Sequence, residues 1–210
     1  MANSNRVKIA LEPPTPRSEI RTITPRDWAD AALWAIGKSS VAELTIDRVA
    51  RTLGVTKGSF YWHFKDRNAL LGAAIQRWEV ICTSQVIEEL DALERPRDRL
   101  LRLLSTVFDE ENNALEIAVL SASEHPLVAP VLTRVAARRL EYLVDTYRGM
   151  GLTPADARCS GLLAYSAYVG LLQIARFAPG ELPTAQARER YIRYLSARLI
   201  PEAQRPRGAK

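Results

Sequence analysis

The hydrophobic period of amphipathic helices runs through almost the whole chain after Thr24, and this feature limits the fold more than any other. Apolar residues in the first such segment follow the spacing i, i+3, i+4, i+7, i+8 that forms one buried helical face. These residues are Trp28, Ala31, Ala32, Ala35 and Ile36. No segment sustains the alternation of a half-buried strand. We therefore expect an all-α protein.

Capping residues and glycines divide the first part of the chain into short helices. Thr24 is a candidate N-cap, and it is followed by a proline, which suits the first helical position. A second helix is expected to begin at Thr45 and to end at Gly54, and Thr56 can cap a third helix only two residues later. A helix, a tight glycine-containing turn and another short helix predict a helix-turn-helix.

The remaining pattern predicts a long helical region and three divisions of the chain. Further helices are expected over about 66–93, 96–110, 112–123, 126–148, 153–177 and 185–199. Residues 1–23 contain three prolines and no apolar period, so we expect a flexible tail, or alternatively an arm that touches DNA phosphates. Residues 24–71 form the predicted helix-turn-helix domain, and residues 72–204 a second helical domain.

Composition excludes several classes of protein. The 210 residues are 47% apolar and 25% charged, which is ordinary for a globular protein and excludes collagen and low-complexity disorder. Two cysteines, Cys82 and Cys159, are too few for a disulfide framework or a four-cysteine zinc site. The first residues lack an apolar run of signal-peptide length, so we expect a cytoplasmic protein. Of the net charge of +5, +4 lies in residues 1–80, which suits a polyanionic partner.

The third helix carries an unusual set of exposed side chains. Phe60 and Phe64 are four residues apart, so they share a face that should pack inward. Gly58 and Trp62 then fall on the opposite face. Ser59, Tyr61 and Lys65 flank that face. A DNA major groove would accept this surface, because serine and aromatic rings contact base edges while lysine, tyrosine and histidine bind phosphates. The alternative is that the two exposed aromatic rings pack against the next helix.

A set of residues at matching spacing resembles the DNA-binding domain of the tetracycline-repressor (TetR) family of bacterial transcription regulators. The set includes Val49-Ala50, Leu53-Gly54-Val55-Thr56-Lys57-Gly58-Ser59-Phe60-Tyr61-Trp62-His63-Phe64 and Leu70-Leu71. The resemblance covers about residues 25–71. Later helices resemble those of the family only in number and length.

The resemblance implies a set of DNA-contacting positions at and around the third helix. They are Thr45, Thr56, Lys57, Gly58, Ser59, Tyr61, Trp62, His63, Lys65 and Arg67. The family usually has lysine where this chain has Arg67. Arginine keeps the charge but offers a planar fork of donors. We expect it to contact a phosphate with a different geometry.

The resemblance also implies that the second domain binds a small molecule and forms a homodimer. Candidate pocket residues are Trp78, Phe108, Glu116, His125, Tyr142, Tyr165 and Tyr168. For each of them, ordinary core packing or surface exposure is the competing interpretation. Candidate dimer-interface residues are Gly161, Ala164, Tyr168, Gly170 and Leu171, on a helix that is apolar around nearly its whole circumference.

The predicted function is that of a ligand-responsive repressor that binds a roughly palindromic double-stranded operator and is released by a small molecule. A constitutive DNA-binding regulator or an activator without an effector is the alternative. An enzyme is disfavoured, because the chain has two histidines and none of the common nucleotide-binding, nucleophile or zinc motifs. We expect no cofactor, no metal site and no membrane span. The acidic run Asp109–Glu111 is interpreted as a solvated helix end.

Overall fold

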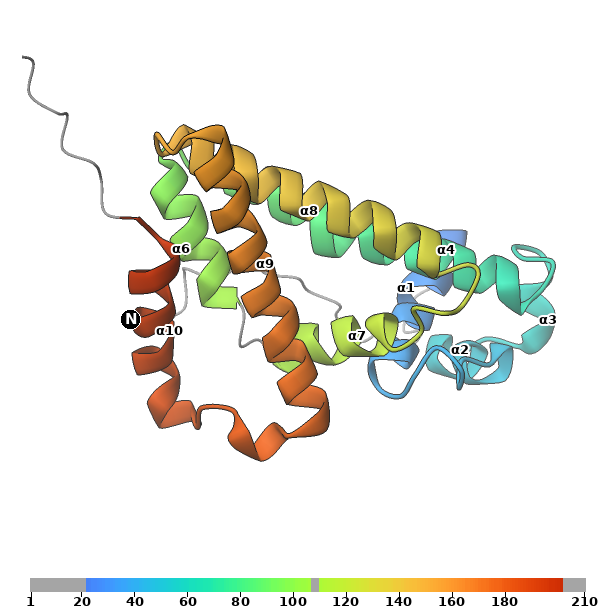
Figure 1. Cartoon of the computed structure of the whole chain (residues 1–210). Coiled ribbons are helices and arrows are strands. Elements are labelled where there is room, and N and C mark those ends of the chain that lie inside the picture. Colours follow the sequence, from blue (N-terminus) through green and yellow to red (C-terminus); the bar gives the residue numbers. More distant parts are fainter. Residues whose placement is uncertain (1–21, 107–109, 202–210) are drawn as a thin grey trace, which may run out of the picture. The chain divides into compact units, whose positions relative to one another are not determined.

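The computed structural model of the chain is all-helical throughout the part that it describes, residues 22–106 and 110–201 (Figure 1). The elements are α1 (Pro25–Gly37), α2 (Ile46–Leu53), α3 (Lys57–Phe60), α4 (Arg67–Glu79), the π-helix η1 (Val80–Ser84), α5 (Gln85–Asp91), α6 (Pro96–Thr106), α7 (Glu110–Leu120), α8 (Ala129–Gly149), α9 (Pro154–Phe177), the 3₁₀ turn η2 (Pro179–Glu181) and α10 (Ala185–Leu199). The predicted fold class is therefore confirmed.

The described residues divide into two compact units. The N-terminal unit contains residues 22–85 and 110–135, and the C-terminal unit contains residues 86–106 and 136–201. Two of the divisions between them fall inside helices, one within α5 and one within α8, and a third falls directly before α7. The units are defined by packing, so the predicted boundary at residue 71 between DNA binding and regulation stays a prediction.

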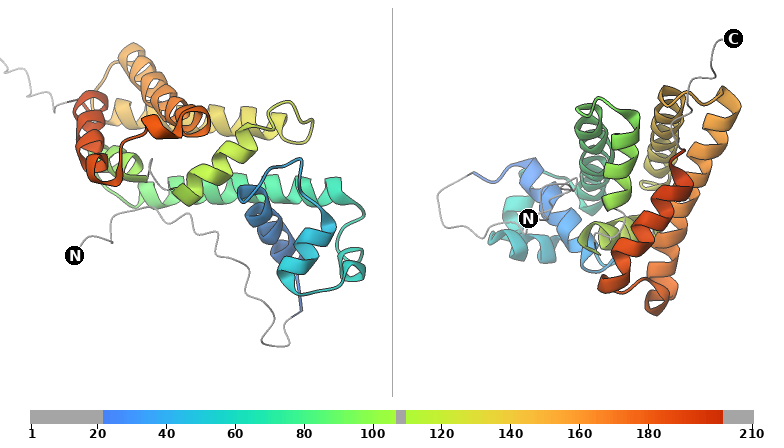
Figure 2. Two further views of the ribbon diagram at one scale, coloured as in Figure 1. Left: turned by 90° about the horizontal axis from the view of Figure 1, so that it is seen from below. Right: turned by 90° about the vertical axis from the view of Figure 1, so that its left-hand side faces the viewer.

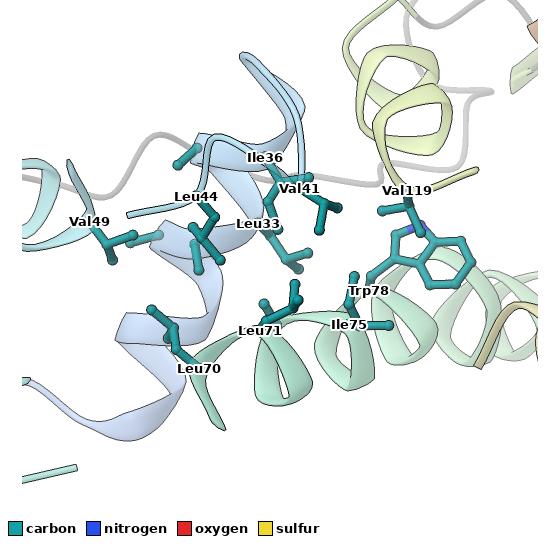
Figure 3. Packing of buried hydrophobic residues seen from close by; sticks show 14 of the residues in the cluster. Leu33, Ile36, Val41, Leu44, Val49, Leu70, Leu71, Ile75, Trp78 and Val119 are labelled. Atoms are coloured by element: carbon teal, nitrogen blue, oxygen red, sulfur yellow. The ribbon is translucent and has the colours of Figure 1, made fainter. Parts of the chain in front are cut away.

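Helix α1 forms the centre of the N-terminal unit. Its start is fixed by a capping box, in which the Asp27 amide donates to the Thr24 hydroxyl and the Thr24 amide donates to the Asp27 carboxylate at 2.8 Å. Helix α1 packs against α2, α4 and α7. The shared core includes Leu33, Ile36 and Val119, all fully buried (Figure 3).

Helices α6, α8, α9 and α10 contribute the core of the C-terminal unit. Helix α10 packs against α6 and also contacts α9 (Figure 2). Tyr147 is fully buried and its hydroxyl donates to the carbonyl of Leu199 at 2.6 Å, which ties α8 to the end of α10. The predicted helices over 153–177 and 185–199 are confirmed, with Thr153 capping α9 through the Asp156 amide.

Several other helix boundaries differ from the prediction. The segment predicted as one helix over 66–93 is interrupted by η1, which falls where the β-branched Val80, Ile81 and Thr83 weaken regular α-helix formation. Helix α7 begins at Glu110 instead of residue 112 and ends at Leu120 instead of residue 123. Helix α6 is described up to Thr106, so the predicted end of the helix over 96–110 falls next to residues outside the described part. Helix α8 begins at Ala129 rather than at residue 126. The amides of Val128 and Ala129 both donate to the carbonyl of His125, so this segment forms a turn.

Candidate nucleic-acid interface

Helices α2 and α3 form a helix-turn-helix whose turn is fixed by backbone geometry. The Thr45 hydroxyl accepts from the Arg48 amide at 3.2 Å and caps α2. Gly54 ends α2 with a left-handed φ of 66°, a conformation that costs glycine little. The amide of Val55 then donates to the carbonyl of Ala50 at 3.0 Å, so the chain turns tightly into α3.

Thr56 occupies the N-cap position of α3, but its side chain makes no capping hydrogen bond. The predicted position of the N-cap is therefore correct, but the predicted side-chain hydrogen bond is absent. The turn is closed instead by the Ser59 amide, which donates to the Thr56 carbonyl at 3.1 Å. The Thr56 hydroxyl lies 3.7 Å from the position that a Cβ on Gly58 would take. Both residues are exposed, so the start of α3 presents a hydroxyl and bare backbone to the outside.

Phe60 anchors α3 to the rest of the N-terminal unit. Its side chain is fully buried and its ring meets the edge of Trp28 on α1 at a centroid distance of 5.3 Å. Phe64 stacks on the same ring at 5.7 Å, and Tyr61 meets it edge-on at 5.2 Å. The inward face that the spacing of Phe60 and Phe64 predicts therefore forms. Such aromatic pairs add about 0.5–1.5 kcal/mol each beyond the area they bury.

The side chains that follow Phe60 point away from this core. Trp62 is 88% exposed and Tyr61 is 59% exposed, which is uncommon for rings of this size. Helix α3 itself ends at Phe60, and the amides of His63 and Phe64 donate back to the Phe60 carbonyl, so these residues form one further turn. Because the turn is short and internally bonded, the two exposed rings are held on a fixed support.

Lys57 lies at the start of α3 and is paired with α2. Its ammonium group donates to the Asp47 carboxylate at 2.9 Å. This hydrogen bond, together with the charge of Asp47, raises the pKa of Lys57 above its ordinary value. Lys57 therefore stays protonated at neutral pH. Asp47 was not among the residues predicted for the site, although its place in the first turn of α2 is visible in the sequence.

The other predicted contact residues differ in exposure. Thr45 and Lys65 are exposed, whereas Ser59, His63 and Arg67 are partly buried. The guanidinium of Arg67 donates to backbone carbonyls in the loop between α1 and α2. This use of Arg67 was not predicted from the sequence, and its predicted phosphate contact stays a prediction.

The candidate pocket residues fall into both units. In the N-terminal unit, the indole of Trp78 donates to the carboxylate of Glu116 at 3.0 Å, and both side chains are buried (Figure 3 shows Trp78). His125 is partly buried and its Nδ1 accepts from the Leu127 amide at 3.2 Å. Phe108 lies outside the described residues. Trp78 and Glu116 are therefore two candidates that the structure joins directly by a hydrogen bond.

The three candidate tyrosines lie in the C-terminal unit. The Tyr142 hydroxyl donates to Asp91 at 3.3 Å, and burial, with a smaller contribution from the charge of Asp91, raises the pKa of Tyr142 to about 12. Tyr142 is therefore neutral at physiological pH. Tyr165 packs against the cluster around Tyr147, and Tyr168 against the cluster around Leu171.

The candidate dimer residues lie on different faces of α9. Gly161 is buried because Val144 of the same chain covers it, at 3.0 Å from an added Cβ, and Leu171 is only 8% exposed. Ala164 and Tyr168 are partly buried against neighbouring clusters of the same unit. A Cβ on Gly170 would meet nothing within 4 Å.

Helix α9 carries an exposed apolar stripe that was not predicted from the sequence. Leu163, Ile174 and Phe177 are 58%, 41% and 72% exposed, and their spacing places them on the same side as Gly170. Intervals of seven, four and three residues from Leu163 through Gly170 to Phe177 are visible in the sequence, so helical periodicity alone could have identified this stripe.

Two other expectations concern features that the described residues lack. None of the helices described is long and apolar enough to span a membrane. Within residues 22–106 and 110–201, no group of three or more acidic, histidine or cysteine side chains is placed to hold a metal ion. Cys82 is buried and Cys159 is exposed, and the two cysteines are not joined in a disulfide.

An all-helical fold with an N-terminal helix-turn-helix, whose second helix is followed directly by exposed aromatic rings and flanked by lysines, is typical of a DNA-binding transcription regulator. Residues 29–74 match the sequence pattern of the bacterial regulatory proteins of the tetR family. The HTH-type transcriptional regulator BetI of Escherichia coli O17:K52:H18 (strain UMN026 / ExPEC) is 30% identical over 132 residues, which are 60% of this chain and 68% of BetI. The chain belongs to the tetR family.

Solved structures agree with this assignment at the level of the fold. A regulator assigned to the TetR family from Mesorhizobium loti superposes with a TM-score of 0.65 at 16% identity, covering 83% of this chain and 92% of that one. The multidrug binding protein EbrR, solved in complex with malachite green, superposes with a TM-score of 0.58 at 21% identity, covering 85% of this chain and 98% of EbrR.

Proposed function

We propose that this protein is a homodimeric repressor that binds a roughly palindromic operator and releases it when a small molecule binds. The observation that carries the proposal is the exposure of Tyr61 and Trp62 directly after the buried anchor Phe60. Large exposed rings on a rigid support are costly in water unless a partner covers them.

The proposed partner of this surface is the major groove of DNA. Helix α3 would enter the groove at Gly58, where the absence of a side chain lets the backbone approach the bases. Tyr61 and Trp62 would meet base edges and thymine methyl groups. Thr45, Lys57 and Lys65 are exposed and would bind phosphates, which fix the register of the protein on the duplex.

A small molecule is proposed to bind near Trp78 and Glu116. These side chains supply an aromatic surface and a buried carboxylate, which suits a ligand with an apolar body and a polar group. A neighbour in fold, EbrR, binds malachite green, which supports a pocket in this kind of scaffold. For release, the ligand must bind the released conformation more tightly than the DNA-bound one.

The proposed dimer buries the apolar stripe of α9. Leu163, Gly170, Ile174 and Phe177 form a mostly apolar stripe with the exposed Ser166 among them, and a symmetric partner would cover it with the same stripe. A two-fold dimer would place two copies of α3 about one turn of the DNA apart, roughly 34 Å. This geometry leads to the expectation of an inverted repeat. A cytoplasmic location is proposed with this function.

The experiment is selection of bound sequences from a random duplex pool with purified protein at about 0.15 M salt, the physiological ionic strength. We expect enrichment of one inverted repeat. The alternative of constitutive regulation predicts the same enrichment with no molecule that releases the duplex, and placement of the repeat relative to its promoter separates repression from activation. No enrichment by folded protein freed of copurified small molecules would contradict the proposal.

A further inference from the structure

The loop between α1 and α2 is held by buried side chains and by hydrogen bonds to its backbone carbonyls. The side chains of Val41 and Leu44 are 3% and 1% exposed and point into the core beside Leu71 (Figure 3). The Leu44 amide donates to the Val41 carbonyl at 3.3 Å, so the loop contains one turn of its own. The carbonyl oxygens of Val41 and Leu44 can accept further hydrogen bonds from donors outside the loop. Such donors stabilise the loop, because a partly buried carbonyl without a partner is destabilising.

Arg67, the first residue of α4, supplies these donors. Its Nε donates to the Leu44 carbonyl at 2.7 Å and its Nη2 donates to the Val41 carbonyl at 2.6 Å. Both donors lie along one edge of the planar guanidinium group, so the two bonds fix the direction of the side chain as well as its distance. Arg67 is partly buried in this arrangement.

The bonded loop leads directly into the DNA-facing residues. Leu44 precedes Thr45, whose hydroxyl caps α2 through the Arg48 amide. In the first turn of α2, Asp47 holds Lys57 at the start of α3. A displacement of the Leu44 carbonyl would therefore move the cap of α2 and the residues that follow it.

We propose that Arg67 is a positioning residue for DNA recognition, which fixes Thr45 and the start of α2 through the Leu44 and Val41 carbonyls. In this role its guanidinium binds the protein backbone and contacts no phosphate. The inference rests on the proposed DNA binding and names how one basic residue serves it. Lysine does not reproduce the arrangement, since a single ammonium group lacks the planar fork of donors that reaches both carbonyls.

The test compares Arg67→Lys and Arg67→Gln with Lys65→Gln, a neighbouring exposed residue proposed to bind phosphate. Affinity for the duplex enriched by the wild-type protein is measured between about 50 and 200 mM salt, together with affinity for an unrelated duplex of equal length. Hydrogen exchange of the Leu44, Arg48 and Val49 amides is measured in the free proteins. This second measurement needs no DNA. It therefore separates failure of the proposed positioning role of Arg67 from failure of the proposed DNA binding.

Both Arg67 variants are expected to lose at least tenfold in affinity for the enriched duplex and little for the unrelated one. Their salt slopes should match the wild type, because no phosphate contact is lost, whereas Lys65→Gln should lower the slope by about 0.9. The three amides should exchange at least tenfold faster in both Arg67 variants and at the wild-type rate in Lys65→Gln. Arg67→Lys binding within threefold of wild type, a slope lowered by Arg67→Gln, or unchanged exchange would each overturn the proposal.

Discussion

Phe60 and Trp62 are two residues apart and have opposite surroundings. Phe60 is fully buried between Trp28 and Phe64, while Trp62 is 88% exposed. Each ring therefore has a separate task, one in holding α3 to the core and one in contacting the outside. Substitutions at the two positions should separate folding from DNA binding.

Trp62→Ala is expected to leave the free energy of unfolding within about 0.5 kcal/mol of wild type, because the side chain has few contacts to lose. It should lower affinity for the selected duplex about tenfold, as expected for one lost base-edge contact. Phe60→Ala should instead destabilise the protein by about 3–5 kcal/mol through the cavity it leaves. Denaturant unfolding and fluorescence anisotropy with labelled duplex measure the two quantities. Wild-type affinity of Trp62→Ala would remove Trp62 from the interface.

The sequence was sufficient to separate these two rings, because the spacing of Phe60 and Phe64 determines which side of a helical turn faces inward. It was not sufficient for Arg67, since a basic residue at the start of a helix serves equally well for a phosphate or for a carbonyl. The choice depends on where the loop of Val41 and Leu44 lies. Leu44 and Val41 lie 23 and 26 residues before Arg67 in the sequence, so the position of their loop is set by packing between distant segments.

At the scale of secondary-structure elements, the turn between α2 and α3 depends on a single glycine. Gly54 has a φ of 66°. An alanine in this left-handed conformation costs about 1–2 kcal/mol, because its Cβ approaches the following carbonyl. Gly72 lies inside α4, and a Cβ added there meets nothing within 4 Å.

The pair Gly54→Ala and Gly72→Ala makes the same chemical change with opposite expected signs. Gly54→Ala should lower the free energy of unfolding by about 1–2 kcal/mol. Gly72→Ala should raise it by about 0.5–1 kcal/mol, since alanine has the higher helix propensity and loses less entropy on folding. Urea unfolding followed by circular dichroism measures both. Equal and small effects would mean that the turn tolerates a side chain at residue 54.

The same local rules explain which elements could be predicted. Capping residues and prolines mark the starts of α1, α2 and α9, and the structure has these starts at the expected residues. The π-turn η1 could not be predicted, because one inserted residue barely changes a hydrophobic period. Helix α8 begins three residues after the predicted start at residue 126, for a different reason. A proline permits a helix start without requiring one, and the bonds to the His125 carbonyl decide the outcome.

At the scale of the whole molecule, the main question is which surfaces are covered by another copy. Sequence composition identified α9 as apolar on most sides, but it could not tell which side the chain itself covers. Val144 covers Gly161, while Leu171 packs into a cluster with residues of α10. The uncovered side holds Leu163, Gly170, Ile174 and Phe177, which defines the surface to be tested.

Leu163→Glu and Ile174→Glu are expected to give folded monomers, because each places a charge on the exposed stripe where a partner would have to desolvate it. Leu127→Glu is the matched control, since Leu127 is also an exposed leucine, 37% accessible, and belongs to no part of the stripe. A substitution at Leu171 would be less informative, because this residue is buried and its loss would damage the core.

Sedimentation equilibrium should give monomers for Leu163→Glu and Ile174→Glu and dimers for the wild type and Leu127→Glu. Affinity for the selected inverted repeat should fall steeply in the two monomeric variants, since each copy then binds one half-site without the gain in effective concentration that the dimer provides. Affinity for an isolated half-site should stay at the wild-type level, because α3 is unaltered. Dimers that persist in both variants would exclude the stripe as the interface.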